Sequence, residues 1–304
     1  MVTKNEGDKN IGVDVGKASV EAIMYAAKLV KPGARLLEVA EASERYLREK
    51  GYAPAFPINL SVNNRAAHYS PSLDDSTVFG ENDVVKVDFG AEKGGVLGDG
   101  ALTVDLSGNN SDMVETAERA LDAAMSKVRA GVEVREIGRE IARVVESAGF
   151  SPIRNLGGHG IGVNELHEGV FIPNYDNGDA TKLEEGQTIA IEPFVTDGNG
   201  LVKEEDTCEI YTFVGHAGVR SPAARQVLSE IEKSYNANPF AARWLSVAAG
   251  SKFGLYAAIT ELARVGAIEP NPVLTESSNG IVTQAEAEIV VENDGYSILT
   301  MATR

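Results

Sequence analysis

The stretch DVVKVDFGAEKGGVLGDGALTVD, residues 83–105, places two runs rich in β-branched residues on either side of Lys93-Gly94-Gly95. Valine and threonine are favoured in strands, and a glycine-rich segment between two such runs is typical of a tight antiparallel turn. We therefore expect a β-hairpin here. The rest of the chain is interpreted around it.

Two aspartates of this hairpin are expected to lie close together. If Lys93-Gly94 form a two-residue loop, Asp88 and Asp99 become direct cross-strand neighbours on one face of the sheet. Two carboxylates in that position repel each other, whereas a divalent cation between them removes the repulsion. Two alternatives stay open: one aspartate points to solvent, or the loop is Gly94-Gly95 and the register differs.

The composition indicates a soluble protein with an acidic surface. The 304 residues include 28 Lys and Arg against 45 Asp and Glu, a formal net charge of −17. Such a surface repels phosphate backbones, so we expect no general nucleic-acid binding. The single cysteine, Cys208, fits a reducing compartment. The polar first ten residues and the lack of a long apolar run predict a cytoplasmic protein without membrane association.

Periodicity and turn residues predict the remaining elements. Helices are expected over residues 12–30, 34–50, from Ser111, as N-cap, to near Gly131, and from after Val134 to before Gly149, followed by an almost entirely helical segment over 221–269. Strands are expected over residues 188–195, 207–214 and in the closing stretch 280–301. Because helices and strands do not alternate regularly, the order predicts an α+β fold.

The stretch NLGGHGIGVNELHEG, residues 155–169, is predicted to be a glycine-rich loop and contains His159 and His167. Its glycines lack the G-x-G-x-x-G spacing of a dinucleotide loop, and no Lys-Ser/Thr pair follows, so phosphate binding is disfavoured. Glycine permits close approach of backbones in a crowded site. Although a single histidine is more often structural, we favour a loop that brings these histidines near a metal.

Two glutamates stand in apolar surroundings. Glu192 interrupts the apolar run TIAIEPFV, where a solitary charge is costly unless it is paired or coordinated. In QAEAEIVV, residues 284–291, Glu286 and Glu288 are expected on the same face of a strand. That face is either a solvated edge or part of a site, and either glutamate is a candidate for the functional one.

Together these side chains make an oxygen-rich ligand set of two aspartates, two glutamates and one histidine. Hard ligands of this kind suit paired divalent ions such as Mn, Fe, Co or Zn better than a structural tetrahedral zinc. Paired metals about 3.5–4 Å apart are a hydrolytic device, because they activate a bridging water and polarise a carbonyl. The sequence therefore favours a dinuclear metallohydrolase.

The order Asp88, Asp99, His159, Glu192 and Glu286 resembles that of the pita-bread metallopeptidases. Four segments are similar to methionine aminopeptidases of type 2, in particular archaeal ones: FPINLSVNNRAAHYSP, VVKVDFGAEKGGVLGDGALTVDL, IRNLGGHGIGVNELHEG and GQTIAIEPFVTDGNG. The resemblance covers nearly the whole chain. The last two glutamates lie 94 residues apart, an interval that the helical insert of type 2 fills.

The resemblance implies a pita-bread (creatinase/aminopeptidase) fold, in which helices flank a curved and mainly antiparallel sheet. It also implies two parts. Residues 1–215 and 276–304 would form the catalytic domain, and residues 216–275 would form a helical insertion subdomain.

The same resemblance implies a role for each ligand. Asp88 would chelate one metal, and Asp99 and Glu286 would bridge both. His159 and Glu192 would complete the shell of the other metal. Glu192 would also carry the proton from the bridging water to the leaving amine.

Substrate contacts are implied as well. His68 and His167 look like the two active-site histidines of the family that bind no metal, so they would hold the substrate and stabilise the tetrahedral intermediate. Phe56, Pro57 and Leu166 fall where the family lines its methionine pocket, which distinguishes side chains mainly by fit.

The chain departs from the family pattern in places. Residues 284–287 read Q-A-E-A where the family has Q-F-E-H, so Ala285 and Ala287 are smaller neighbours of the last glutamate. Asn59 stands where many type 2 enzymes have glycine, and Asn271 where an aromatic residue is common. His216 matches no family role and is expected on the surface.

The implied function is removal of the initiator methionine from nascent proteins and peptides with a small second residue, by attack of a metal-bridging water. One alternative is another pita-bread peptidase, of Xaa-Pro type, but no room precedes Asp88 for the additional domain of those enzymes. A second is a non-catalytic pita-bread binding protein, although all five ligands are present. The expected partners are peptide and nascent-chain N-termini, with a transient ribosome contact, and we expect a monomer.

Overall fold

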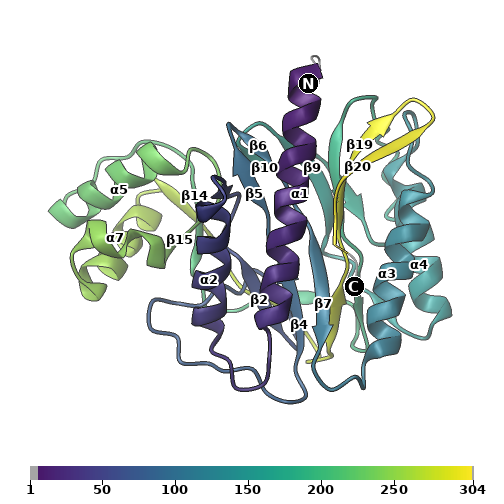
Figure 1. Ribbon diagram of the computed structural model, residues 1–304, viewed down its shortest axis with the longest axis horizontal. Coiled ribbons are helices and arrows are strands. Elements are labelled where there is room, and N and C mark those ends of the chain that lie inside the picture. The colour runs from purple at the N-terminus through teal and green to yellow at the C-terminus, as the bar shows by residue number, and fades with distance from the viewer. Residues whose placement is uncertain (1–5, 303–304) are drawn as a thin grey trace.

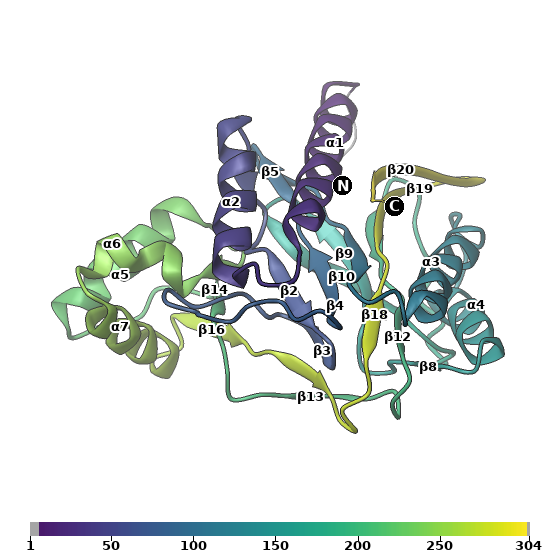
Figure 2. The same ribbon diagram turned by 60° about the horizontal axis from the view of Figure 1, so that its bottom comes forward.

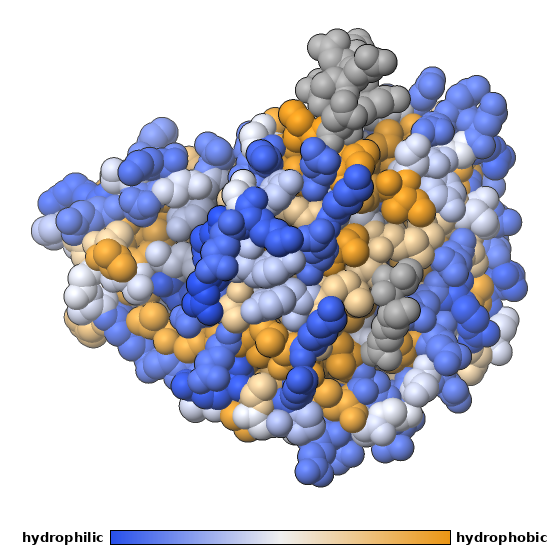
Figure 3. Space-filling model, in the orientation of Figure 1, coloured by the Kyte–Doolittle hydropathy of each residue, from blue (hydrophilic) through white to orange (hydrophobic). Residues whose placement is uncertain are grey.

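Two pairs of helices pack against antiparallel β-structure in the computed structural model, which describes residues 6–302 (Figure 1). The pairs are α1 (Glu6–Leu29) with α2 (Leu36–Glu49), and α3 (Ser111–Met125) with α4 (Val134–Ser147). Apolar residues at helical spacing bury one face of each helix and leave the opposite face polar. On the face shown in Figure 3, hydrophilic residues accordingly cover most of the outer edges.

The stretch 83–105 forms the predicted hairpin, but in a different register. Its strands are β4 (Val84–Asp88), β5 (Ala91–Lys93), β6 (Val96–Leu97) and β7 (Ala101–Asp105). Lys93 faces Val96, so the loop is Gly94-Gly95, and Asp88 faces Ala101. The alternative of a Gly94-Gly95 loop is therefore confirmed, whereas the Lys93-Gly94 loop and the direct pairing of the two aspartates are wrong. Both loop residues have positive φ, 63° and 86°, which suits two glycines and disfavours lysine.

This hairpin belongs to two small sheets. The first sheet has the order β2-β4-β7, with β2 (Asn59–Val62), and the second has the order β1-β5-β6, with β1 (Ala53–Pro54). Asn59 is the cross-strand partner of Asp88. Buried residues of α1 and α2 pack on β4, so the first helix pair covers this part of the molecule.

The glycine-rich stretch is a hairpin, not the predicted loop. It contributes β9 (Gly157–Gly162) and β10 (Glu165–Pro173) to a five-stranded sheet of order β10-β9-β11-β19-β20. A Cβ added to Gly158 would lie 2.1 Å from the carbonyl oxygen of Ala190, and one added to Gly160 would lie 2.0 Å from that of Glu168. Glycine is therefore required for β9 to pass between its two neighbours.

Both isolated glutamates lie where the chain leaves one sheet and enters another. Residues 188–195 are not one strand, because β11 (Thr188–Ile191) ends before Glu192-Pro193 and β12 (Phe194–Thr196) begins after it. In the same way, β18 (Val282–Gln284) and β19 (Ala287–Glu292) are separated by Ala285-Glu286, and β20 (Gly295–Met301) follows. Strands β12 and β18 pair with each other and β12 pairs with β8 (Ser151–Pro152), whereas β11 and β19 belong to the five-stranded sheet.

Helix α3 ends earlier than predicted. The segment after Met125 turns through backbone bonds from Lys127 to Ala124 and from Val128 to Met125, and Gly131 then donates to Leu183. These tertiary contacts end the helix although its apolar periodicity continues. The N-cap is Asn110, and Ser111 is the first helical residue.

A separate cluster of buried side chains lies among the helices seen at the left of Figures 1 and 2. The helices are α5 (Pro222–Ser234), α6 (Ser246–Ala249), α7 (Lys252–Arg264) and the 3₁₀ turn η1 (Ala242–Leu245). They pack on a sheet of order β15-β14-β16, formed by β15 (Phe240–Ala241), β14 (Ile210–Phe213) and β16 (Ile268–Asn271). The segment is therefore less purely helical than predicted, and β14 precedes residue 216.

A last sheet has the order β13-β17-β3, with β13 (Val202–Glu204), β17 (Leu274–Glu276) and β3 (Arg65–Ala67). Every paired strand within residues 6–302 is antiparallel to its neighbour, which confirms the predicted α+β class. Within the same residues, none of the helices has the length and apolar character needed to cross a membrane.

Candidate active site

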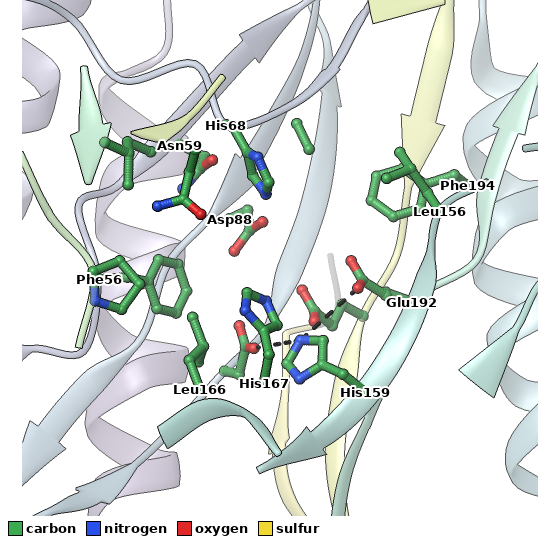
Figure 4. A pocket seen from close by; sticks show the side chains of 16 residues that line it. Phe56, Asn59, His68, Asp88, Leu156, His159, Leu166, His167, Glu192 and Phe194 are labelled. Carbon is green, nitrogen blue, oxygen red and sulfur yellow. Dashed lines mark ion pairs between the residues drawn. The ribbon is translucent and has the colours of Figure 1, made fainter. Parts of the chain in front are cut away.

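Side chains from strands of several sheets meet at one cavity (Figure 4). Asp88 ends β4, Asp99 lies between β6 and β7, and His159 lies in β9. Glu192 and Glu286 come from the two breaks between sheets. The structure thus brings all five predicted ligands to one cavity, although they are far apart in sequence.

His159 presents a lone pair to two carboxylates. Its Nε2 lies 3.4 Å from Asp99 Oδ2 and 3.9 Å from Glu192 Oε1. Its Nδ1 lies 3.1 Å from the carbonyl oxygen of Gly160, which only accepts, so Nδ1 carries the proton. Burial lowers the pKa of His159 to about 3, which keeps the ring neutral at neutral pH. A lone pair facing two carboxylates is unfavourable unless a proton or a cation lies between them, so the arrangement suits a metal ion.

The carboxylates themselves are crowded and poorly solvated. Burial raises the pKa of Asp99 to about 7. Burial and then the repulsion of Asp99 raise the pKa of Asp88 and of Glu286, and burial with the charge of Asp88 raises that of Glu192. Among the described residues, Asp88 Oδ1 is buried without a hydrogen-bond donor. Four acids in this state fit a positively charged ligand.

Three of these residues already have the spacing of a metal site. Asp99, His159 and Glu286 each offer one ligand atom, and the three atoms lie within 4.8 Å of one another. Asp88 and Glu192 line the same cavity beside them. Carboxylate oxygens and an imidazole nitrogen are common ligands of divalent transition metals, so the residues present fit such an ion.

Gln284 and Glu288 support this cluster. Gln284 Nε2 donates to Glu192 Oε2 at 3.1 Å and to Glu286 Oε2 at 3.4 Å. Glu288 Oε2 accepts from the backbone N–H of Asp99 at 3.2 Å, and burial raises the pKa of Glu288 to about 8. Glu286 is 2% exposed and Glu288 is 1% exposed, so the alternative of a solvated edge is wrong.

The other two site histidines lie around the same cavity. His68 has a φ of 65°, a left-handed conformation that is uncommon for histidine and clusters at functional sites. Its Nδ1 donates to the carbonyl oxygen of Pro272 at 3.2 Å, and burial lowers its pKa to about 4. The ring of His167 meets that of His159 edge-on, with 4.3 Å between centroids. His216, by contrast, is exposed and pairs with Glu232, as predicted for a surface residue.

One wall of the cavity is apolar. Phe56 and Leu166 line it as predicted, whereas Pro57 is buried but does not line the cavity. Sequence reasoning missed several lining residues: Ala67, Leu156, Phe194, Ile210 and Pro239. Phe194 follows Glu192 closely in the chain, which is a local signal. Ile210 and Pro239 reach the cavity only through the sheet β15-β14-β16, so no local pattern identifies them.

Comparisons with known proteins agree with this geometry. Residues 13–212 match metallopeptidase family M24. A methionine aminopeptidase of Archaeoglobus fulgidus is 44% identical over 288 residues, 95% of this chain and 97% of that protein. The methionine aminopeptidase of Methanocaldococcus jannaschii is 41% identical over 295 residues, 97% and 99% of the two chains. The chain therefore belongs to metallopeptidase family M24 and, within it, to the methionine aminopeptidases of archaeal type.

Solved structures show the fold. A methionine aminopeptidase from Thermotoga maritima superposes with a TM-score of 0.72 at 23% identity, covering 99% of this chain and 100% of that one. A thermophilic Arx1 gives 0.84 at 16% identity, covering 97% and 92%. The predicted pita-bread fold is confirmed. Family membership and the cluster of Asp99, His159 and Glu286 together support the use of a divalent metal.

Proposed function

We propose that this chain removes the initiator methionine from nascent proteins and peptides whose second residue is small. One observation supports the proposal most directly. The unprotonated Nε2 of a neutral His159 ring faces Asp99 and Glu192 in a cavity that also has an apolar wall. Curated relatives named methionine aminopeptidase, 36–44% identical to the chain, support the same activity. The alternatives of an Xaa-Pro peptidase and of a non-catalytic binding protein lack such support.

We propose that Asp88, Asp99, His159, Glu192 and Glu286 hold two divalent ions, drawn from Co, Mn, Fe and Zn. When bound, such ions supply Lewis-acid polarisation of the scissile carbonyl and a water that is acidic enough to attack near neutral pH. The buried carboxylates favour this occupancy because each pKa is raised while the site lacks positive charge.

Glu192 is the proposed proton carrier. Gln284 Nε2 donates to its Oε2, which orients the carboxylate in the cavity, and this carboxylate would receive the proton of the attacking water and pass it to the leaving amine.

His68 and His167 are proposed to contact different parts of the bound peptide. Because His68 donates through Nδ1 to Pro272, its Nε2 in the neutral ring is an acceptor and suits a peptide N–H of the substrate. His167 is more exposed and lies against His159, and it is the proposed donor to the oxyanion that forms at the scissile carbonyl.

Phe56 and Leu166 are the proposed contacts for the methionine side chain. The proposed contribution of Pro57 is indirect. Its carbonyl oxygen accepts a hydrogen bond from the side chain of Asn59, which lines the cavity. An apolar wall of this kind distinguishes methionine from other side chains mainly by fit.

The proposal includes a division of the chain. Residues 1–215 and 276–304 would form the catalytic domain, and residues 216–275 the insertion subdomain, a division supported by the separate buried cluster of α5, α6 and α7. We further propose a cytoplasmic monomer that contacts the ribosome transiently, since its proposed substrates emerge there. Co-sedimentation with ribosomes and size-exclusion chromatography test these two points.

The activity is tested with protein freed of metal and then reloaded with Co, Mn, Fe or Zn. Release of methionine from Met-Ala-Ser but not from Met-Leu-Ser supports the proposal. Cleavage of an Xaa-Pro peptide in preference to Met-Ala-Ser would favour the prolidase-type alternative. Folded protein that binds none of these metals would favour a binding protein.

A further inference from the structure

Asn59 has one polar atom without a partner. The residue is 5% exposed and lines the cavity. Its Nδ2 donates to the carbonyl oxygen of Pro57 at 2.9 Å. Because a carbonyl only accepts, this bond fixes which way the amide is turned and leaves Oδ1 as the free atom. Among the described residues, none donates to Asn59 Oδ1.

The free oxygen lies at the border between the carboxylates and the apolar wall. Asn59 and Asp88 are cross-strand partners in β2 and β4, so their side chains project from the same face, roughly 5 Å apart at Cβ. Figure 4 shows Asn59 between Phe56 and His68, above Asp88. A substrate with its first side chain at Phe56 and its scissile carbonyl at the carboxylates must place its first α-carbon near this border.

The chemistry of that α-carbon supplies the missing donor. The methionine thioether has no N–H or O–H, so the side chain cannot satisfy Asn59 Oδ1. The peptide N–H of the second residue lies beyond the scissile carbonyl. The α-amino group is attached to the α-carbon itself and carries N–H donors, so it is the donor that lies nearest to this border.

We infer that Asn59 Oδ1 accepts a hydrogen bond from the α-amino group of the substrate's first residue, which makes Asn59 a determinant of selectivity for free N-termini. This inference rests on the proposed function. It adds a recognition element for the amine that is separate from the five proposed metal ligands and from the apolar wall. The loss of a hydrogen bond in a buried site is readily measured, because it leaves a buried polar group without a partner.

The test uses two ligands that the protein cannot cleave: L-methionine and 4-(methylthio)butanoate, which lacks only the amine. Their affinities for metal-loaded protein are measured by isothermal titration calorimetry, and the ratio of the two dissociation constants reports recognition of the amine. We expect the intact chain to prefer methionine and Asn59→Leu to reduce that preference about 10-fold or more. Asn59→Gly removes the acceptor without adding an apolar side chain, and should have the same effect.

Two further variants sharpen the result. Asn59→Asp keeps an oxygen facing the cavity, so the preference for methionine should persist. Asn271→Leu removes the other amide that lines the cavity, whose Nδ2 donates to Thr212 Oγ1, and should leave the ratio unchanged. Metal content and melting temperature are measured for every variant, so that loss of metal or of fold is separated from loss of the contact.

The outcomes distinguish this inference from the proposed function. An unchanged ratio in both Asn59→Leu and Asn59→Gly overturns the inference, and so does an intact chain that does not discriminate between the two ligands. If the intact chain releases methionine from Met-Ala-Ser while the ratio of dissociation constants is the same in the intact chain and in the Asn59 variants, the function stands and the inference fails. If no methionine is released but the ratio depends on Asn59, the amine contact stands and the proposed function fails.

Discussion

Gln284 Nε2, at the end of β18, donates to Glu192 Oε2 in the break before β12, while Glu192 Oε1 lies 3.9 Å from His159 Nε2. One amide thus fixes the orientation of this carboxylate toward His159. Gln284 also reaches Glu286, so it orients two of the proposed ligands together.

Replacement of Gln284 with leucine should weaken metal binding about 10- to 100-fold, because partners that orient ligands typically contribute that much. Competition with a fluorescent chelator measures the change. Gln187→Leu is the matched control, since Gln187 accepts from Glu184 at the surface. Equal metal affinities in the two variants would show that Gln284 does not orient the ligands.

Glu192→Gln should lower kcat at least about 100-fold while the fold survives, because a positioned acid or base typically contributes 10²- to 10⁴-fold. The measurement is methionine release from Met-Ala-Ser at saturating metal, with circular dichroism as the control for folding. A variant that keeps more than about a tenth of wild-type kcat would rule out Glu192 as the proton carrier.

The four histidines allow an internally controlled experiment. We expect His159→Ala to lose metal, and His68→Ala and His167→Ala to retain metal while kcat falls. His216→Ala should change neither, because His216 is exposed and contacts Glu232 and Phe213, neither of which lines the cavity. Metal content is measured by mass spectrometry beside turnover. Loss of metal from His167→Ala would show that His159 is not the only histidine ligand.

A pH-dependent stability difference is expected at Glu205, which joins Arg65 in β3 and accepts from Thr275 in β17. Burial alone would raise the pKa of Glu205, but the hydrogen bonds from Arg65 and Thr275 outweigh it and lower the pKa. The charged form is therefore stabilised by folding. This stabilisation is fully present above the ordinary glutamate pKa of about 4.3 and is lost as the pH falls through the lower folded value.

Glu205→Gln should accordingly destabilise the metal-free protein by up to about 1 kcal/mol at pH 7, since the pair is partly exposed. Urea unfolding of both proteins between pH 7 and about pH 3 checks the sign. The difference should be constant down to about pH 4.3 and shrink below that. A difference that grows on acidification would contradict the assignment.

A buried ion pair between Glu44 and Arg243 connects α2 to η1 in the predicted insert. Arg243 pairs with Glu44 and donates to Ser70, and Trp244 Nε1 donates to Glu44 Oε2 at 2.7 Å. Removal of one partner leaves a buried charge, so Glu44→Leu should cost about 3–5 kcal/mol, whereas Glu44→Leu with Arg243→Met should recover most of it. Urea unfolding followed by fluorescence of Trp244, the only tryptophan, measures both. Additive effects of the two substitutions would exclude this coupling.

The sequence predicted the proposed ligands better than it predicted their surroundings. Charged residues in apolar runs, such as Glu192, stand out because burying them is costly. The register of the central hairpin was wrong because Lys93-Gly94 and Gly94-Gly95 differ by one residue, and only the φ angles of the folded turn decide between them.

Other misses have equally physical reasons. Glycine lowers strand propensity and so predicts a loop over 155–169, yet the close spacing of three strands requires glycine there. Two-residue strands such as β15 are too short to show periodicity, so β15 was assigned to the helical segment. The pocket residues Ile210 and Pro239 depend on that sheet. The catalytic and metal-binding roles themselves stay predictions until the substitutions are made.

Glu192 and Glu286 lie at breaks between strands, outside the hydrogen-bonded ladders of the sheets. Loss of either side chain therefore removes no rung of a ladder, and in the metal-free protein it relieves repulsion between buried acids. The architecture thus separates the backbone ladders that maintain its shape from the side chains proposed to perform its chemistry. We expect that a descendant of such a chain can lose either of these two proposed ligands by a single substitution and persist as a folded scaffold, open to selection for a different task.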